Sequence, residues 1–425
     1  MAANQSSPGV VVQERDLTTI TTAATENIGL IAAPFELGPV EEIVEISSER
    51  DLVDRFGKPN DNNYEYWYTA AQFLSYGGTL KTVRIDSTTL KNAVSNGTAV
   101  KVKNLQDYET TYEGGTNTWF YGSRTAGTKG NSIGIFKTDS GADQIAVVPA
   151  PGSGNDWEFV ADEAVSATGG AAGKVFKYSV VLTVTTVVGD FTPGTSTTVA
   201  ISGSNQTVDV LAWDPANKKL ELGIPSGGIT GILADGQTVT QGSNTAVIAA
   251  SGIERRVYIA KNKSTIDFAA ADSIQDTNSN AAAISSVRDE YLEREYLPGV
   301  KWINVAPRPG TSLYASNAGG FRDEVHVIVV DVDGGITGTT GAVLERFVGL
   351  SKASDAKTSV GETNYYKEVI KQRSEYIYWG KHETGLFSAT STASDGNWGQ
   401  TAASRQFNLL RSSTGSTDYP AGRTT

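Results

Sequence analysis

The longest stretch of this 425-residue chain with one consistent residue pattern has the pattern of β-strands, and it limits the folds that the chain can adopt. Between residues 89 and 250 helical periodicity is absent. Short runs of β-branched residues dominate, as in residues 175–188 and 238–248, and glycine-rich stretches such as 168–173 and 223–231 separate them. Such runs with turn residues between them predict strands. We therefore expect one or two all-β modules of barrel or sandwich type here.

The sequence before this block reads as alternating strands and helices. We expect strands at residues 27–34, 41–46 and 80–85, a helix capped by Ser48, and a second helix over residues 64–76. The apolar run at residues 27–34 is typical of a buried strand. Strands that alternate with helices predict an α/β layer.

The same alternation resumes after the block. Residues 281–297 give the clearest helical periodicity of the chain, and Pro298-Gly299 would end that helix. We also expect a helix at residues 365–373. The expected strands are at residues 302–306, 324–331, 343–350 and 376–379.

Together these patterns predict an α+β multidomain protein in which an all-β block is inserted into an α/β frame. A chain of this length exceeds one core of ordinary size, so several domains are expected. The predicted division is an extended N-terminal arm (1–25), a first part of the frame (26–88), the β-rich insertion (89–250), a second part of the frame (251–387) and a Ser/Thr/Gly-rich tail (388–425).

Charge and composition exclude several functional classes. Lys and Arg number 35 against 47 Asp and Glu, so the formal net charge is −12. Such an acidic chain gains nothing from counterion release on phosphate backbones, so we expect no nucleic-acid partner, and an anionic membrane surface would repel it. The sequence contains no apolar window long enough to span a membrane. Residues 1–8 are small and polar, unlike a signal peptide, so we expect synthesis in the cytosol.

Catalytic groups and metal ligands are scarce. The chain has no cysteine and two histidines, His326 and His382, so neither thiolate nor His-rich metal sites can be built. We expect His326, inside a Val-rich run, to be structural and His382 to be solvated in a polar loop. No catalytic residue, cofactor or metal site is predicted, and we do not expect an enzyme.

Two glycine-containing motifs resemble ligand loops but lack essential residues. The run Asp331–Gly335 begins like a calcium loop, but the glycine needed at the sixth position is Ile336. We expect a hairpin turn there instead. The run before Lys174 resembles a phosphate loop, but Thr168 replaces its first glycine and Val175 its Ser or Thr. We therefore reject a phosphate site.

A cluster of aromatic residues falls in the second predicted helix. It comprises Tyr64, Tyr66, Trp67 and Tyr68. At helical spacing such residues form core or a protein interface more often than a surface that stacks a ligand.

Residues 7–22 predict a single extended strand, because β-branched residues follow Pro8-Gly9 and no hairpin partner lies nearby. The unpaired N–H and C=O groups of such a strand must add to a sheet, in this chain or in another. The residues alone favour an ordinary first strand of the main sheet over a strand exchanged between subunits.

Three segments carry a resemblance to a known family. Residues 7–16 contain Pro-Gly-Val-x-Val-x-Glu, and residues 120–136 contain a pattern similar to Gly-x-x-Gly-Asn-x-Leu-x-Val, with Ala126 and Lys129 where Pro and Trp are usual. The longest is residues 322–379, with its Asp-Glu-Val-His-Val-Ile-Val-Val-Asp and Tyr-Ile-Tyr-Trp sequences. Together these segments resemble the contractile tail sheath proteins of myovirus-type bacteriophages, including those of large myoviruses and cyanophages.

The resemblance implies a structural subunit that assembles mainly with itself. Sheath subunits form six-fold rings, stacked as a helix around a tail tube, with the α/β part inward and inserted β domains outward. A baseplate signal triggers contraction, which drives the tube through the host envelope for genome ejection. The implied partners are the tail tube, baseplate and tail terminator proteins. The implied location is the virion tail, after assembly in the host cytoplasm.

The resemblance also changes the interpretation of the N-terminal strand. In this family an extended N-terminal arm pairs into the sheet of a neighbouring subunit. By that resemblance, the residues of an inter-subunit arm are Pro8, Gly9, Val10, Val12 and Glu14.

Two questions stay open at the level of sequence. Sheath proteins of this kind continue beyond the Tyr-Ile-Tyr-Trp region with a C-terminal inner domain, so the chain is either a short member or part of a longer protein. The alternatives to a phage sheath are the sheath of a cell-encoded contractile injection system and a β-rich phage or surface adhesin.

Overall fold

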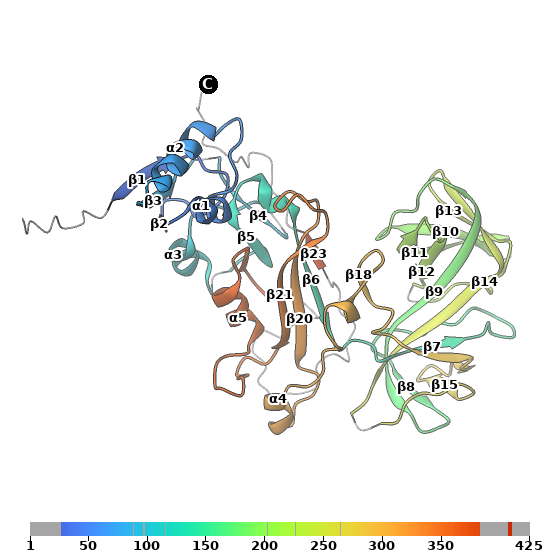
Figure 1. Ribbon diagram of the computed structural model, residues 1–425. Helices are drawn as coiled ribbons and strands as arrows, with labels where there is room; N and C mark the ends of the chain where they lie inside the picture. Colours follow the sequence, from blue (N-terminus) through green and yellow to red (C-terminus); the bar gives the residue numbers. More distant parts are fainter. Residues whose placement is uncertain are drawn as a thin grey trace, which may run out of the picture.

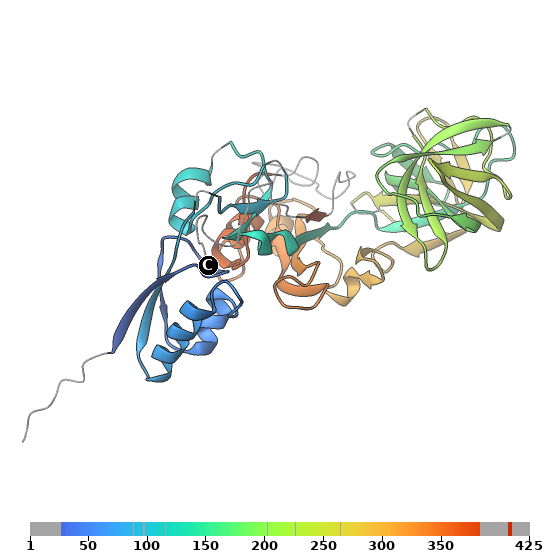
Figure 2. The ribbon, with the colours of Figure 1, turned by 90° about the horizontal axis from the view of Figure 1, so that it is seen from above.

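The computed structural model describes residues 27–382 and 407–409, apart from residues 88, 97, 115, 202, 226 and 264. The described chain forms two lobes (Figures 1 and 2). We call them the frame (residues 27–139 and 290–382) and the barrel block (residues 144–289). The predicted N-terminal arm, including Pro8, Gly9, Val10, Val12 and Glu14, lies outside the described residues.

The frame begins with a small sheet covered by two helices on one face. Its strand order is β1 (Ile28–Ala33), β3 (Thr79–Arg84) and β2 (Ile43–Ile46), with β1 parallel and β2 antiparallel to β3. The helices are α1 (Glu49–Phe56) and α2 (Tyr64–Ser75). All five elements were predicted from the sequence.

Local chemistry explains where α1 begins and ends. The Ser48 side chain accepts a hydrogen bond from the backbone N–H of Asp51 at 3.1 Å, which satisfies one of the free donors of the first turn. Gly57 ends the helix at a φ of 84°, a conformation that favours glycine.

The prediction that the apolar run at residues 27–34 is buried was wrong. Ile28 and Leu30 are 51% and 71% exposed. They lie on the face of β1 that the two helices do not cover, and β1 is the edge strand of its sheet. Only the alternate residues, such as Ile31, pack against the helices.

The rest of the frame contains two larger sheets, besides a two-stranded one formed by residues 295–301. The first has the order β21 (Ala342–Ser351), β20 (Glu324–Asp331), β6 (Ile133–Asp139) and β23 (Phe407–Leu409). The second has the order β22 (Ile377–Trp379), β5 (Tyr121–Ala126) and β4 (Asn92–Val94). Helix α5 (Tyr366–Arg373) contacts β21 and β22.

These sheets confirm the predicted strands at residues 324–331, 343–350 and 376–379 and the helix at 365–373. The strand predicted at residues 302–306 was wrong, because residues 302–304 form a short 3-10 helix. The sheets also pair strands on both sides of the barrel block, because β6 pairs with β20 and β5 pairs with β22. The sheets therefore join strands of the predicted insertion (89–250) to strands of the predicted second part of the frame (251–387), and the division into domains stays a prediction. The shorter elements of the frame are α3 (Leu105–Asp107), η1 (Tyr108–Tyr112), η2 (Thr128–Ser132), β18 (Glu295–Leu297), β19 (Val300–Lys301), η3 (Trp302–Asn304) and α4 (Leu313–Asn317).

The barrel block contains a closed barrel of six strands. In order around it these are β9 (Ala172–Val188), β12 (Lys219–Gly223), β11 (Ser204–Asp214), β10 (Ser196–Ile201), β13 (Thr238–Gln241) and β14 (Asn244–Lys261), which pairs again with β9. Inward-facing residues such as Leu182, Val199 and Leu222 are fully buried. The predicted β-rich insertion of barrel type is confirmed in this respect, and closure leaves the barrel without free edges.

Two barrel strands continue beyond the barrel. The 17 residues of β9 and the 18 residues of β14 stay paired from Val188–Thr245 to Gly173–Lys261. There they form a second sheet with β8 (Ala164–Ala167), β15 (Ser273–Asp276), β16 (Ala281–Ala283), β7 (Gln144–Val148) and β17 (Ser286–Asp289). The barrel and this lower sheet therefore share their two longest strands.

The helix predicted over residues 281–297 does not exist. The segment contains β16, which pairs with β15, β17, which pairs with β7, and then a turn and β18. Ala282 and Ile284 are buried while Ala281 and Ala283 are exposed, which is the two-residue period of a strand. The apolar spacing also fitted a helix, but pairing with the edges of β15 and β7 makes these residues strands.

Among the described residues, no helix is both long enough and apolar enough to cross a membrane.

Candidate functional site

Two chain segments connect the lobes, residues 140–143 on the way to the barrel block and residues 290–308 on the way back. Charged side chains collect where these segments meet the sheets. The basic ones are Arg294, Arg308, Arg322 and Lys352, and the acidic ones are Asp139, Asp143, Asp289 and Glu290. We call this group of eight residues the joint. Its four basic and four acidic side chains balance in charge.

Arg294 is the most deeply buried basic group of the joint after Lys352, with 4% of its side chain exposed. Its guanidinium binds the Glu290 carboxylate from Nε at 3.0 Å and from Nη2 at 2.5 Å. It also donates to Thr138 Oγ1 and to the carbonyl oxygen of Asp139, both at 2.6 Å. One side chain of the returning segment thus holds the outgoing segment where it leaves β6.

Asp143 is the acidic centre of the joint. Its carboxylate accepts hydrogen bonds from Arg308 Nη1 at 3.1 Å, from Arg322 Nη2 at 2.5 Å and from the backbone N–H of Lys261 at 2.7 Å. Arg322 lies two residues before β20 of the frame, whereas Lys261 is the last residue of β14 in the barrel block. Asp143 therefore bonds to both lobes at once.

Arg308 joins the ends of the two connecting segments. It donates to the carbonyl oxygens of Ala142 and Asp143, each at 3.0 Å, and to Asp289 Oδ1 at 2.5 Å. Its guanidinium also lies 5.6 Å from the centre of the Tyr291 ring, and Arg294 lies 5.3 Å from the same ring. Burial raises the pKa of Tyr291 to about 12, so the ring stays neutral between the two cations.

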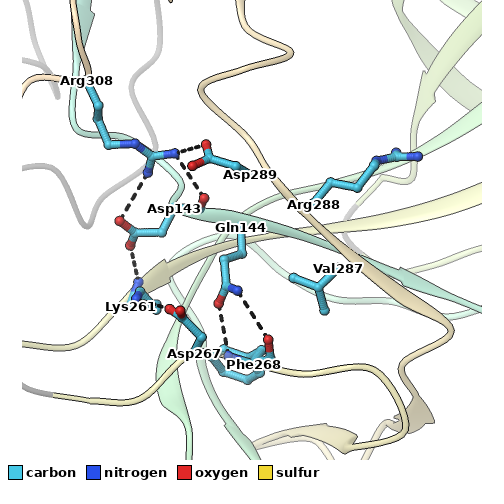
Figure 3. Close-up of a pocket in the computed structure, with 9 residues that line it drawn as sticks. All are labelled: Asp143, Gln144, Lys261, Asp267, Phe268, Val287, Arg288, Asp289 and Arg308. Atoms are coloured by element: carbon cyan, nitrogen blue, oxygen red, sulfur yellow. Dashed lines mark hydrogen bonds and ion pairs between the residues drawn. The ribbon is translucent and has the colours of Figure 1, made fainter.

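A pocket of about 550 Å³ opens beside the joint (Figure 3). In Figure 3 the Arg308 guanidinium lies between Asp143 and Asp289. The other two basic side chains of the pocket lining are paired as well, Lys261 with Asp267 and Arg288 with Glu254. The lining is therefore internally neutralised, and we assign it no anion.

The prediction that His326 is structural was confirmed. Its side chain is buried between two backbone groups: Nε2 lies 2.8 Å from the carbonyl oxygen of Pro307, and Nδ1 lies 3.0 Å from the backbone nitrogen of Gly349. Because a carbonyl only accepts and an N–H only donates, the ring is neutral with its proton on Nε2. Burial lowers the pKa of His326, in agreement with that state.

The prediction that His382 is solvated was wrong. The ring is half-buried in an aromatic cluster, 2.5 Å from the Tyr366 hydroxyl and packed edge-on against Trp379 at 4.8 Å. Burial, together with the positive charge of Lys367, lowers the pKa of His382 to about 4. The two histidines bind different partners, and among the described residues neither is hydrogen-bonded to a nucleophile in the arrangement of a catalytic triad.

The two rejected ligand loops have ordinary structural roles. Residues 332–341 join the antiparallel strands β20 and β21, as expected of a hairpin, and Asp331 Oδ2 accepts the backbone N–H groups of Ile336 and Thr337. A strand, β9, and not a helix follows Gly170. Within the described ranges, no group of three or more His, Cys, Asp or Glu side chains could hold a metal ion.

The aromatic cluster of α2 divides between core and surface. Trp67 is buried and donates to the carbonyl oxygen of Gly57 at 2.9 Å, as expected of core. The exposed members are Tyr64, Tyr66 and Tyr68, at 48%, 37% and 58%. Their use as an interface stays a prediction.

Sequence reasoning missed the joint. Arg294 and Thr138 are 156 residues apart, and Arg322 and Asp143 are 179 apart. No local spacing links such residues, because the sheets alone bring them together. Gly141, whose φ is 52°, is the one local signal of an unusual backbone in the outgoing segment.

Comparison with curated proteins identifies relatives, although no family model matches the chain. A protein of Salmonella phage ViI is 24% identical to this chain over 87% of its length. Proteins of Vibrio phage KVP40 and Enterobacteria phage T4 are 40% and 33% identical over 22% and 20% of the chain. All three are tail sheath proteins.

The resemblance to phage tail sheath proteins is thereby confirmed. The three names denote a structural component of the virion and none denotes an enzyme, in agreement with the expectation from the sequence. The matched region covers 48% of the ViI tail sheath protein and 14% and 13% of the other two. The chain therefore spans about half the length of the first of these relatives.

Proposed function

We propose that this chain is the structural subunit of a contractile phage tail sheath. It polymerises as stacked hexameric rings around the tail tube and contracts to drive the tube through the host envelope for genome ejection. The observation that carries the proposal is the similarity to a tail sheath protein over 87% of the chain. The shorter matches to two further tail sheath proteins support the phage over a cell-encoded injection system.

The two-lobed shape supports a division of labour within the subunit. The frame combines mixed sheets with helices, and the chain passes between it and the barrel block through residues 140–143 and 290–308. We assign the frame to the inner layer of the sheath and the barrel block to the outer layer. An outer lobe without free barrel edges can face solvent without recruiting other strands.

The proposed partners follow from this role. They are other copies of the chain, the tail tube protein, and the baseplate and tail terminator proteins. Subunits would assemble in the host cytoplasm and reside in the virion tail. Because a head-to-tail contact that does not close generates a helix, one interface repeated between copies is sufficient to build such a filament.

Negative-stain electron microscopy of the purified full-length protein tests the proposal directly. We expect rings or long hollow helical tubes at high protein concentration. A monodisperse monomer or trimer under the same conditions would contradict it, and a trimer would favour the adhesin alternative.

The N-terminal arm gives a more specific prediction. If residues 7–22 pair with a neighbouring subunit, Val10 and Val12 share one face of the strand, and Val10→Asp with Val12→Asp should abolish long tubes. The chain should stay folded, as judged by circular dichroism, because the arm would contribute only between subunits. Gln13→Asp, on the opposite face, is the matched control and should still form tubes. Tubes of normal length from the double variant would disprove the exchanged strand.

A further inference from the structure

We infer that the joint fixes the barrel block at one orientation relative to the frame, and that Arg294 is the positioning residue that holds it. The inference concerns the isolated chain and does not depend on the proposed function. A barrel block attached through two chain segments would be free to swivel if those segments were ordinary loops. The contacts of the joint show that they are not.

Both connecting segments are packed. The returning segment places Tyr291 and Trp302 against Phe136, Ile328 and Val330 of the frame sheet, and all five residues are buried. The outgoing segment places Ala142 in a buried cluster with residues of the lower sheet. Apolar contacts thus attach each segment to one lobe. Any rotation of one lobe against the other would therefore have to occur where the two segments meet.

Arg294 lies where the two segments meet. Its N–H groups are directed at the Glu290 carboxylate on its own segment and at Thr138 and Asp139 at the end of β6, where the outgoing segment begins. Further contacts reach the carbonyl oxygens of Ser140 and Ala142 at 3.3 and 3.5 Å. A planar guanidinium offers five N–H groups in a fixed fork, so a swivel of one segment would break several of these bonds together.

Gly141 shows that the backbone is built around this guanidinium. Its φ of 52° lies in the left-handed region, and a side chain at this position would collide with Arg294 Nη2. The outgoing segment therefore has its one glycine where Arg294 passes. This is a second observation that points to the same residue, independent of the hydrogen bonds.

The second set of ties lies at Asp143. Arg322 comes from the frame and donates both to Asp143 and to the carbonyl oxygen of Lys261, the latter at 2.9 Å. Its backbone φ of 61° is unusual for a residue with a side chain. Buried ion networks contribute little net stability because desolvation offsets attraction, but they penalise every geometry in which a charge loses its partner. A network of this kind selects one orientation.

Single-molecule fluorescence energy transfer tests the inference on the full chain. The chain has no cysteine, so Val188→Cys in the barrel block and Val360→Cys in the frame, 56% and 80% exposed, give two unique dye sites. We expect one narrow distribution of transfer efficiency. With Arg294→Lys, which keeps the charge and loses the fork, the distribution should become at least twofold wider. Arg373→Lys, in an exposed ion pair with Glu362, is the matched control and should leave it unchanged.

A second variant and a measurement of folding distinguish a lost orientation of the lobes from a lost fold. Gly141→Ala displaces the guanidinium without removing a charge and should widen the distribution in the same direction. Hydrogen exchange in the barrel strands and in β20 should stay at the level of the parent chain for both variants. A broad distribution in the parent chain would overturn the inference, and so would a narrow one in both folded variants.

Discussion

The two histidines show how the surroundings of a side chain set its protonation state. His326 is held neutral by one backbone acceptor and one backbone donor, and His382 by its aromatic surroundings and Lys367. In both cases the structure favours the uncharged ring. The sequence predicted the first environment, because a Val-rich run indicates burial, and missed the second, because the aromatic partners of His382 come from α5 and β22 together.

These environments predict a pH dependence. By NMR, the His382 ring should titrate near pH 4, and the His326 ring should titrate below the ordinary value of about 6.5. Both pKa values are lowered in the folded state, so their contribution to stability is complete above about pH 6.5. It is lost as the pH falls toward the folded-state values, because the unfolded chain then binds protons that the folded chain does not.

The assignment of the two NMR signals requires only His326→Gln and His382→Gln, since the chain has two histidines. Titration of either ring at or above its ordinary pKa would contradict the buried arrangement described for it.

At the scale of elements, the best predictions were those with a local cause. The cap at Ser48 and the stop at Gly57 determine α1 from within the sequence. The failed helix at residues 281–297 has the opposite explanation. Its strands exist because β15 and β7 offer unpaired edges, and those edges come from residues far away in the chain. The open face of β1 was missed for a related reason, since an apolar run does not reveal which face a helix will cover.

One ion pair shows how two loops are attached to a barrel strand. Arg255 of β14 binds Asp156 through two bonds of 2.7 and 2.6 Å, and their side chains are 4% and 0% exposed. Asp156 also accepts the backbone N–H of Leu233 at 3.0 Å. The loops around Asp156 and Leu233 are therefore held to the same strand by one carboxylate.

Asp156→Ala should destabilise the protein by about 3–5 kcal/mol, because it leaves the Arg255 guanidinium buried without its partner. Urea unfolding monitored in the barrel block measures the effect. Glu362→Ala removes an exposed ion pair with Arg373 and should cost no more than about 1 kcal/mol. Equal costs for the two variants would show that burial of the first pair is unimportant.

At the scale of the whole molecule, the sequence predicted a protein of mixed α and β structure with a β-rich insertion. The runs of β-branched residues separated by glycine-rich turns were sufficient for that prediction. It could not place the joint, because contacts such as those of Arg294 with Thr138 and of Arg322 with Asp143 join residues more than a hundred positions apart. The division into domains stays a prediction. Strands β5 and β6 have the residue pattern of the predicted insertion but pair with strands of the frame.

The barrel block should fold without the frame. Its main core lies wholly between Ala146 and Val287, and its first and last residues, Gln144 and Asp289, are register partners in the pair of β7 and β17. Residues 144–289 expressed alone should therefore give a cooperative thermal transition and a dispersed NMR spectrum.

Residues 172–261 form the control for this experiment. They contain the six barrel strands but lack the core residues contributed by the lower sheet, and they should be markedly less stable. If residues 144–289 are unfolded in isolation, the frame must supply part of the core.

The register of Gln144 with Asp289 also determines how the molecule responds to force. A pull between the lobes enters the barrel block through these two neighbouring residues, at the same end of an antiparallel pair. Such a load separates β7 from β17 like a zipper, one rung after another, which is the weak direction of a sheet. Arg308 bonds Asp143 to Asp289 directly ahead of the first rung. A pull between the lobes therefore loads the bonds of Arg308 before it loads the first rung of the sheet.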